Sequence, residues 1–106
     1  MRINIEGVVG ELTTLPGCSQ VAVSHAVFVQ RNERGKGKGT AANLSRRILA
    51  GELGYDLMIC TVDAANSAEI AVLGKAGWHP LTSFVSSKTG HTVEVWACST
   101  VKTEAI

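Results

Sequence analysis

A glycine-rich, basic segment between an apolar strand and an amphipathic helix limits what this chain can fold into. The segment Arg34-Gly35-Lys36-Gly37-Lys38-Gly39 follows a run rich in β-branched residues at 20–29. Glycines let successive backbone N–H groups turn toward one point, and a helix N-terminus adds further unpaired N–H groups. A pyrophosphate suits such a place, because it needs many donors and little steric bulk. The sequence therefore predicts a phosphate-binding loop at 30–39.

Positive charge gathers around the same segment. Six of the ten Lys and Arg residues lie between positions 30 and 47, against the single acid Glu33. They are Arg31, Arg34, Lys36, Lys38, Arg46 and Arg47. The net charge of the chain is only +1, which predicts no general attraction to nucleic acid. A local positive focus on a nearly neutral protein instead predicts a small anionic ligand.

Periodicity predicts the other elements. Strands are expected at 2–9, 20–29 and 55–62, with a turn at Pro16-Gly17 and a hairpin of 82–87 with 91–98. A helix at 40–53 should bury a stripe that contains Ala41, Leu44, Ile48 and Leu49. A second helix at 67–76 should bury Ile70, Leu73 and Ala76 and end at Gly77.

This order of elements predicts the fold class. It corresponds to an α/β (α+β) fold, in which a mixed, mostly antiparallel sheet carries one right-handed β-α-β crossover and two main helices. The 106 residues have the size of one domain, expected over 1–106, and 45% apolar content is enough for a core. No run of 18 apolar residues or secretory leader is found, so a cytoplasmic protein without a membrane partner is expected. The cysteines Cys18, Cys60 and Cys98 match no disulfide framework or metal-binding spacing, which fits a reducing compartment.

Three kinds of phosphate loop compete for the glycine-rich segment. A Walker loop requires a lysine after its last glycine, but Gly39 is followed directly by Thr40. The dinucleotide fingerprint Gly-x-Gly-x-x-Gly/Ala matches 37–42, although seven polar or charged residues separate it from its strand. The dinucleotide interpretation therefore stays open as an alternative that fits the spacing less well.

The third kind of loop comes with a family resemblance. Arg34-x-x-Gly37-x-Gly39 resembles the Gln/Arg-x-x-Gly-x-Gly/Ala signature of the GNAT family of N-acetyltransferases, including the strand before it and the helix after it. Asn66-Ser67-Ala68 and Gly74-Lys75-Ala76-Gly77-Trp78 look like the family's second motif, and the likeness covers roughly 20–98. The resemblance implies a GNAT-like acyl-CoA-binding core, with acetyl-CoA as co-substrate and no metal. The implied reaction is direct attack of an amine on the thioester.

The resemblance also implies roles for single positions. The coenzyme A pyrophosphate would be held by Arg34 and the backbone of Gly35, Lys36, Gly37, Lys38, Gly39 and Thr40. The strand at 20–29 would splay from the next parallel strand, and the backbone of Val27, Phe28 and Val29 would pair with the pantetheine amides in the gap. A backbone N–H near Val29 would polarise the acetyl carbonyl. Asn66 would bond near the pantetheine or thioester.

Two departures from the family pattern bear on function. The family's fold opens with a strand and two helices that form a wall of the acceptor site, and the 33 residues before Arg34 leave no room for those helices. Another subunit or the substrate itself would supply that wall. A two-fold homodimer is expected, with the hairpin 82–98 as first candidate for the contact and Phe84 and Trp96 as candidate anchors. Leu73 stands where many members have a tyrosine that protonates the leaving thiolate. An acetyl-CoA-binding module that acts through partner recognition is thus the alternative to an enzyme, and the amine acceptor is not identified.

Several other side chains have a functional and a structural interpretation. His25, on the signature strand, is the candidate general base. Its structural interpretation is a half-buried histidine that is hydrogen-bonded to its neighbours. Cys60 is a possible nucleophile, but a buried small apolar residue is the favoured interpretation. His79 and His91 are expected in a loop and in the hairpin turn. Arg46 and Arg47 are expected on the solvated helix face, within reach of the 3′-phosphate of coenzyme A.

Overall fold

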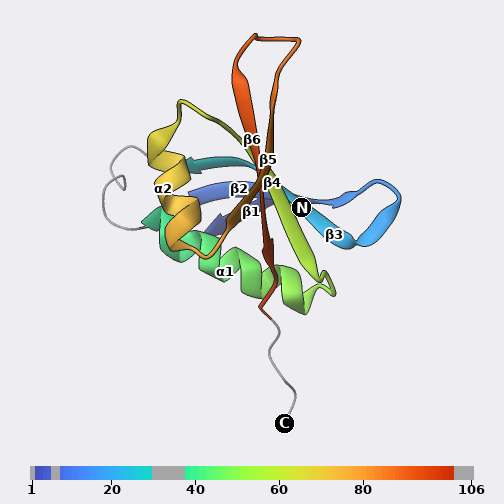
Figure 1. Ribbon diagram of the computed structural model, residues 1–106. Helices are drawn as coiled ribbons and strands as arrows, with labels where there is room; N and C mark the ends of the chain where they lie inside the picture. Colours follow the sequence, from blue (N-terminus) through green and yellow to red (C-terminus); the bar gives the residue numbers. More distant parts are fainter. Residues whose placement is uncertain (1, 6–7, 30–37, 102–106) are drawn as a thin grey trace.

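The computed structural model describes the backbone of residues 2–5, 8–29 and 38–101 and the side chains of 10–24 and 43–101. In this part of the chain, strands and helices follow one another as shown in Figure 1. The N-terminal strands are β1 (Arg2–Ile5), β2 (Val8–Leu15) and β3 (Cys18–Val29). They are followed by α1 (Lys38–Glu52), β4 (Leu57–Asp63), α2 (Ser67–Lys75), β5 (His79–Val85) and β6 (Thr92–Ser99).

The strands form one mixed sheet. Its order is β1-β2-β3-β4-β6-β5, and every neighbouring pair is antiparallel except β3 with β4. The helix α1 connects the two parallel strands, as a β-α-β crossover requires. The predicted fold class, a mixed and mostly antiparallel sheet with one crossover and two helices, is confirmed.

The N-terminal strands differ from the prediction. The single strand expected at 2–9 is the whole of β1 and the start of β2, which pair antiparallel with Ile5 opposite Val8. The strand β2 then continues to Leu15, just before the predicted turn at Pro16-Gly17, where Gly17 has φ 80°. Apolar residues occur on both sides of residues 6–7, as Ile3 and Ile5 and then Val8-Val9, so periodicity alone did not show the reversal.

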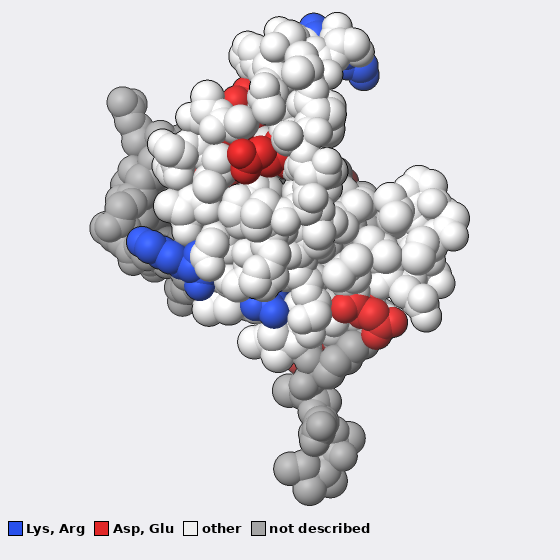
Figure 2. Space-filling model, viewed as in Figure 1, with Lys and Arg blue, Asp and Glu red and all other residues white. Residues whose placement is uncertain are grey.

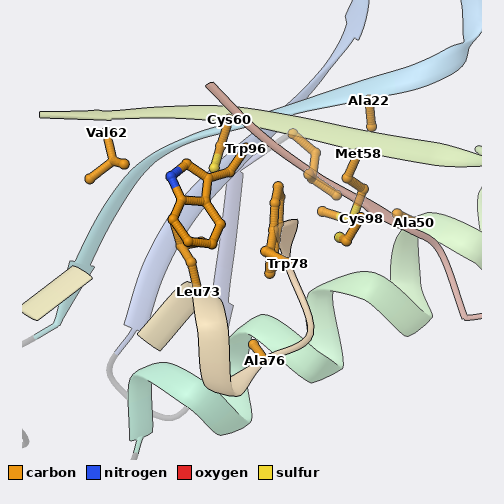
Figure 3. Packing of buried hydrophobic residues seen from close by; sticks show 11 residues of the cluster. Ala22, Ala50, Met58, Cys60, Val62, Leu73, Ala76, Trp78, Trp96 and Cys98 are labelled. Carbon is orange, nitrogen blue, oxygen red and sulfur yellow. The ribbon is translucent and has the colours of Figure 1, made fainter. Parts of the chain in front are cut away.

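The core lies between the sheet and the two helices, which contact each other on one face of it. Alternate residues of β4 are buried there, together with residues of β3, β6 and α2. The central residues are Ala22, Met58, Cys60, Val62, Leu73, Ala76, Trp78, Trp96 and Cys98 (Figure 3). Trp96 is only 8% exposed, and its indole Nε1 donates a hydrogen bond to Glu94 Oε1 at 2.9 Å. Trp96 is therefore a core residue, and its predicted role as an interface anchor is wrong.

The helix α1 buries only part of the predicted stripe. Its buried residues are Asn43, Arg46 and Ala50, and the predicted Leu49 packs partly buried against the core, whereas Leu44 and Ile48 are 41% and 39% exposed. The predicted place of the two arginines on the solvated face is also wrong. Arg47 donates from Nε to the Ser99 carbonyl at 3.0 Å and from NH1 to the Ala76 carbonyl at 2.8 Å, and so ties α1 to the ends of β6 and α2. Sequence periodicity had placed the apolar residues inward because Ala41, Leu44, Ile48 and Leu49 recur at helical spacing.

None of the helices in the described part of the chain is long and apolar enough to cross a membrane.

Candidate functional site

The two parallel strands separate part-way along their length. β3 and β4 pair from Val21 opposite Leu57 to Val23 opposite Ile59. Beyond that point β3 continues to Val29 and β4 to Asp63, with no further pair between them in the described backbone. The carboxyl ends of the two strands therefore diverge and open a gap in the sheet. Ser24 and Cys60 are the first residues past the last pair, so they mark its start.

A pocket of about 290 Å³ lies at this gap, between the diverging strands and the two helices. Its lining comes from β3, α1, β4 and the segment from Asn66 to Trp78. The lining residues are Ser24, Asn43, Cys60, Thr61, Val62, Asp63, Asn66, Glu69, Leu73 and Trp78. Polar groups are thus concentrated where the strands part, which is unusual for the inner side of a helix-covered sheet.

The buried guanidinium of Arg46 lies behind this pocket. Its NH1 donates to Ser24 Oγ at 3.0 Å, while Nε and NH2 have no hydrogen-bond partner among the described residues. The guanidinium also contacts Gly10, where an added Cβ would lie 2.6 Å from NH2. Burial lowers the pKa of Arg46, and the nearby Glu69 opposes that shift. Removal of a completely buried cation from water costs folding free energy, which the hydrogen bond to Ser24 offsets in part.

Two other titratable groups of the pocket hold their protons more tightly than usual. Burial raises the pKa of the Glu69 carboxyl, with a smaller opposing effect from Arg46. Burial and the nearby Glu69 raise the pKa of the Cys60 thiol to about 12. Cys60 therefore remains a thiol at neutral pH, and its interpretation as a buried small residue fits better than a nucleophile.

Asn66 stands where β4 passes into α2. It is the N-cap of that helix, and its Oδ1 accepts a hydrogen bond from the Glu69 backbone N–H at 3.2 Å. The side-chain oxygen is thereby engaged, which leaves the amide N–H₂ to contact a ligand. Asn66 and Asp63 line the pocket and also a second, more open hollow of about 730 Å³.

Comparison with solved structures identifies the architecture. The fold is similar to spermidine N-acetyltransferase from Vibrio cholerae, solved with CoA and spermine, at 12% identity, TM-score 0.78 and 88% coverage of this chain. It is similar to an acetyltransferase of the GNAT family from Streptococcus pneumoniae at 12% identity, TM-score 0.73 and 89% coverage. A Salmonella typhimurium protein solved with its cofactor acetyl-CoA aligns at 20% identity, TM-score 0.74 and 93% coverage. The chain has the GNAT fold.

The GNAT likeness rests on structure. No protein-family model matches the sequence, and no curated protein matches it either. The chain spans 57%, 58% and 61% of the lengths of the three aligned proteins, which is less than two thirds of each.

Within the GNAT fold, the predicted site residues occupy one end of the sheet. His25, Val27, Phe28 and Val29 lie in β3 beyond its last pair with β4, and His25 is opposite Glu11 of β2. Lys38, Gly39 and Thr40 form the first turn of α1. Arg34, Gly35, Lys36 and Gly37 lie outside the described residues, so their predicted contacts remain predictions.

Two of the six cations of the predicted positive focus turn inward. Arg46 is completely buried and Arg47 hydrogen-bonds two backbone carbonyls, whereas Arg31, Arg34 and Lys36 lie outside the described residues. On the face drawn in Figure 2, the charged side chains of the described residues form small, separate groups. Sequence reasoning also missed Ser24, Asn43 and Glu69. Glu69 could have been predicted, because the Asn66-x-x-Glu69 spacing is typical of a helix start.

Leu73, which stands where many family members have a tyrosine, lies at the pocket. Leu73 is buried on the pocket side of α2 and has no proton to give. The chain's single tyrosine, Tyr55, precedes β4 and hydrogen-bonds Thr14 through its hydroxyl, at the opposite end of that strand from Asn66.

Proposed function

We propose that this protein is an N-acetyltransferase that passes the acetyl group of acetyl-CoA to an amine of a small molecule, peptide or protein lysine. The observation that carries the proposal is the gap between the parallel strands β3 and β4, with a polar pocket at its inner side. In the chain, the glycine-rich segment follows β3 and leads into α1. The GNAT fold supports this interpretation over a dinucleotide-binding one.

The residues around the gap fit a pantetheine chain, which carries amide groups. Backbone groups of Val27, Phe28 and Val29 lie in the part of β3 that forms no pair with β4 in the described backbone. On the pocket wall, the indole Nε1 of Trp78 is buried and has no hydrogen-bond partner among the described residues. An unsatisfied buried donor costs about 1–3 kcal/mol, which a ligand acceptor would recover. Acetyl-CoA would supply an acetyl group already activated as a thioester.

The pyrophosphate end of the ligand belongs to the glycine-rich segment in this proposal. Residues 34–40, from Arg34 to Thr40, would present backbone N–H groups and positive charge at the start of α1. Asn66 would donate from its side-chain amide near the thioester, because its oxygen already caps α2.

The raised pKa of Glu69 offers a replacement for the absent tyrosine. Glu69 lies one helical turn before Leu73 and lines the same pocket. Because burial raises its pKa, this carboxyl retains its proton to a higher pH than an exposed glutamate and can give it to a departing thiolate. The alternative is a module that binds acetyl-CoA for partner recognition and transfers nothing.

Ligand-induced stabilisation tests the proposal directly. Acetyl-CoA should raise the melting temperature more than NAD or ATP does, since a ligand bound only by the folded state stabilises it. Gly37→Val should abolish that shift with a nearly unchanged circular dichroism spectrum, because a β-carbon would obstruct the approach of phosphate. A larger shift with NAD would favour the dinucleotide alternative. Thiol release from acetyl-CoA with a panel of amines then separates an enzyme from a binding module.

The expected homodimer and cytoplasmic location belong to the same proposal. β5 is an edge strand whose seven residues are all exposed, including Leu81, Phe84 and Val85. Two copies joined at these edges would cover them and extend the sheet. Light scattering at micromolar concentration should give the mass of two chains, and a monomeric mass with full activity would contradict it. Three free cysteines fit a reducing compartment.

A further inference from the structure

An aspartate and a histidine far apart in the sequence meet at the end of β4. His91 Nδ1 and Asp63 Oδ2 are 2.8 Å apart. The other carboxylate oxygen, Oδ1, accepts the Ala65 backbone N–H at 2.9 Å. Both oxygens of Asp63 are therefore engaged, and the carboxylate is held in one orientation toward the imidazole.

The backbone on both sides fixes this pair. The Ala64 N–H donates to the Thr92 carbonyl at 2.9 Å and joins the end of β4 to the start of β6. The Ser86 N–H donates to the His91 carbonyl at 2.8 Å, and the His91 N–H donates to Thr89 Oγ1 at 3.2 Å. The imidazole thus stands on a hydrogen-bonded turn whose position relative to β4 is set by the sheet.

The pair lies at the boundary between the two cavities of the candidate site. The more open hollow is lined by Asp63, Ala64, Ala65, Asn66, His91 and Thr92. Asp63 and Asn66 also line the pocket in the gap between β3 and β4. A molecule in the open hollow would therefore lie beside His91 and also beside Asn66, the residue assigned to the thioester.

The charges around His91 favour one tautomer. Hydrogen bonds from Ala65 and then from His91 lower the pKa of the Asp63 carboxyl, so it is an anion at neutral pH. A carboxylate accepts, which places the imidazole proton on Nδ1 and the lone pair on Nε2. Nε2 has no hydrogen-bond partner among the described residues. Asp63 is the charged group of β4 that contacts the ring, and Lys88 and Glu94 are the charged residues of the turn and of β6 nearest to it in the chain.

We propose that His91 is the general base for the amine acceptor, and that Asp63 is its positioning residue. This rests on the proposed acetyl transfer. An acceptor that enters the open hollow as an ammonium gives one proton to Nε2, which makes a neutral amine and an imidazolium beside the Asp63 carboxylate. The amine nitrogen then bonds to the acetyl carbon as the carbon–sulfur bond breaks. The sulfur and the new amide nitrogen exchange protons with Glu69 or water, so that a thiol and a neutral amide result.

Matched histidine variants test the proposal. His91→Gln should lower kcat/KM for an ammonium acceptor by about 10²–10⁴-fold and remove the rise of kcat/KM with pH that a histidine base produces. His79→Gln is the control, because His79 is exposed on the far edge strand β5, and it should change neither quantity. Acetyl-CoA should stabilise both variants as much as the wild type, which separates a lost base from a lost ligand site.

A measurement that does not depend on activity tests Asp63. In Asp63→Asn the amide oxygen would keep the bond to the Ala65 N–H, and the amide nitrogen would then face Nδ1 as a donor. The ring should switch to the Nε2–H tautomer, visible in nitrogen-15 NMR, and kcat/KM should fall with it. Unchanged kinetics of His91→Gln would overturn the proposal and leave the pair as a clamp on the hairpin. Loss of the pH-dependent rise in His25→Gln instead would assign the base to His25. If acetyl-CoA neither binds nor reacts, the proposed function fails, whereas the tautomer still reports whether the pair is built as described.

Discussion

The sheet has a closed half and an open half, and the same elements build both. In the closed half β3 pairs with β4, and Ala22, Met58 and Cys98 pack against Ala50 of α1. In the open half the strands part, and the same faces of β3 and α1 carry Ser24, Asn43 and Arg46. One step of two residues along β3, or one turn along α1, changes the lining from apolar to polar. The apolar core extends into both halves, but the buried polar side chains of β3 and α1 are found in the open half.

Truncation in the closed half should have the largest effect of the changes considered. Met58 is fully buried, so Met58→Ala should lower the free energy of unfolding by about 2–5 kcal/mol through lost burial and a cavity. Urea denaturation measures it. Leu57→Ala, at the next position on the opposite face, is the matched control, and with 36% exposure it should cost about 1 kcal/mol or less. Equal losses at the two positions would contradict a core confined to the helix-covered face.

The apolar elements were the part most accessible from the sequence. The strand predicted at 20–29 corresponds to β3, and the helix predicted at 67–76 corresponds to α2, where Leu73 and the C-cap Ala76 are buried as expected. These elements have strong apolar periodicity with glycines at their ends, for example Gly77 with φ 88°. Local pattern and tertiary packing agree there, so periodicity was sufficient.

The open half was predicted poorly for a physical reason. A polar residue at a helical position is normally read as solvated, and this rule placed Arg46 outside although it is completely buried. The contact between Asp63 and His91 depends on the register of β4 with β6, in which Asp63 is opposite Val93. Such a contact spans 28 positions and leaves no local signal. The polar contacts that the sequence did not reveal therefore lie where periodicity and the usual solvation of polar residues give no guidance.

A second prediction concerns Gly10, where β2 passes over the Arg46 guanidinium. Gly10→Ala would place a Cβ 2.6 Å from Arg46 NH2, and the buried side chain has little room to move. Overpacking of this kind should cost about 1–3 kcal/mol of unfolding free energy. Gly74→Ala is the control: the site is within α2 with nothing inside 4 Å, so it should be neutral or stabilising by up to about 1 kcal/mol. If Gly10→Ala were as well tolerated as Gly74→Ala, the guanidinium would not occupy this place.

The smallest effect on stability is expected where the buried charge itself is removed. Arg46→Met relieves the desolvation of a cation of which two nitrogens have no hydrogen-bond partner in the described part of the chain, but leaves the Ser24 hydroxyl without its donor. These terms oppose each other, so the free energy of unfolding should change by only about 1 kcal/mol in either direction. In this background Gly10→Ala should lose most of its cost, and a double-mutant cycle measures that coupling. A loss above about 3 kcal/mol in Arg46→Met would show that the guanidinium is a net stabilising group of the open half. The two halves would then differ in the polarity of their buried side chains, and both kinds of side chain would stabilise the fold.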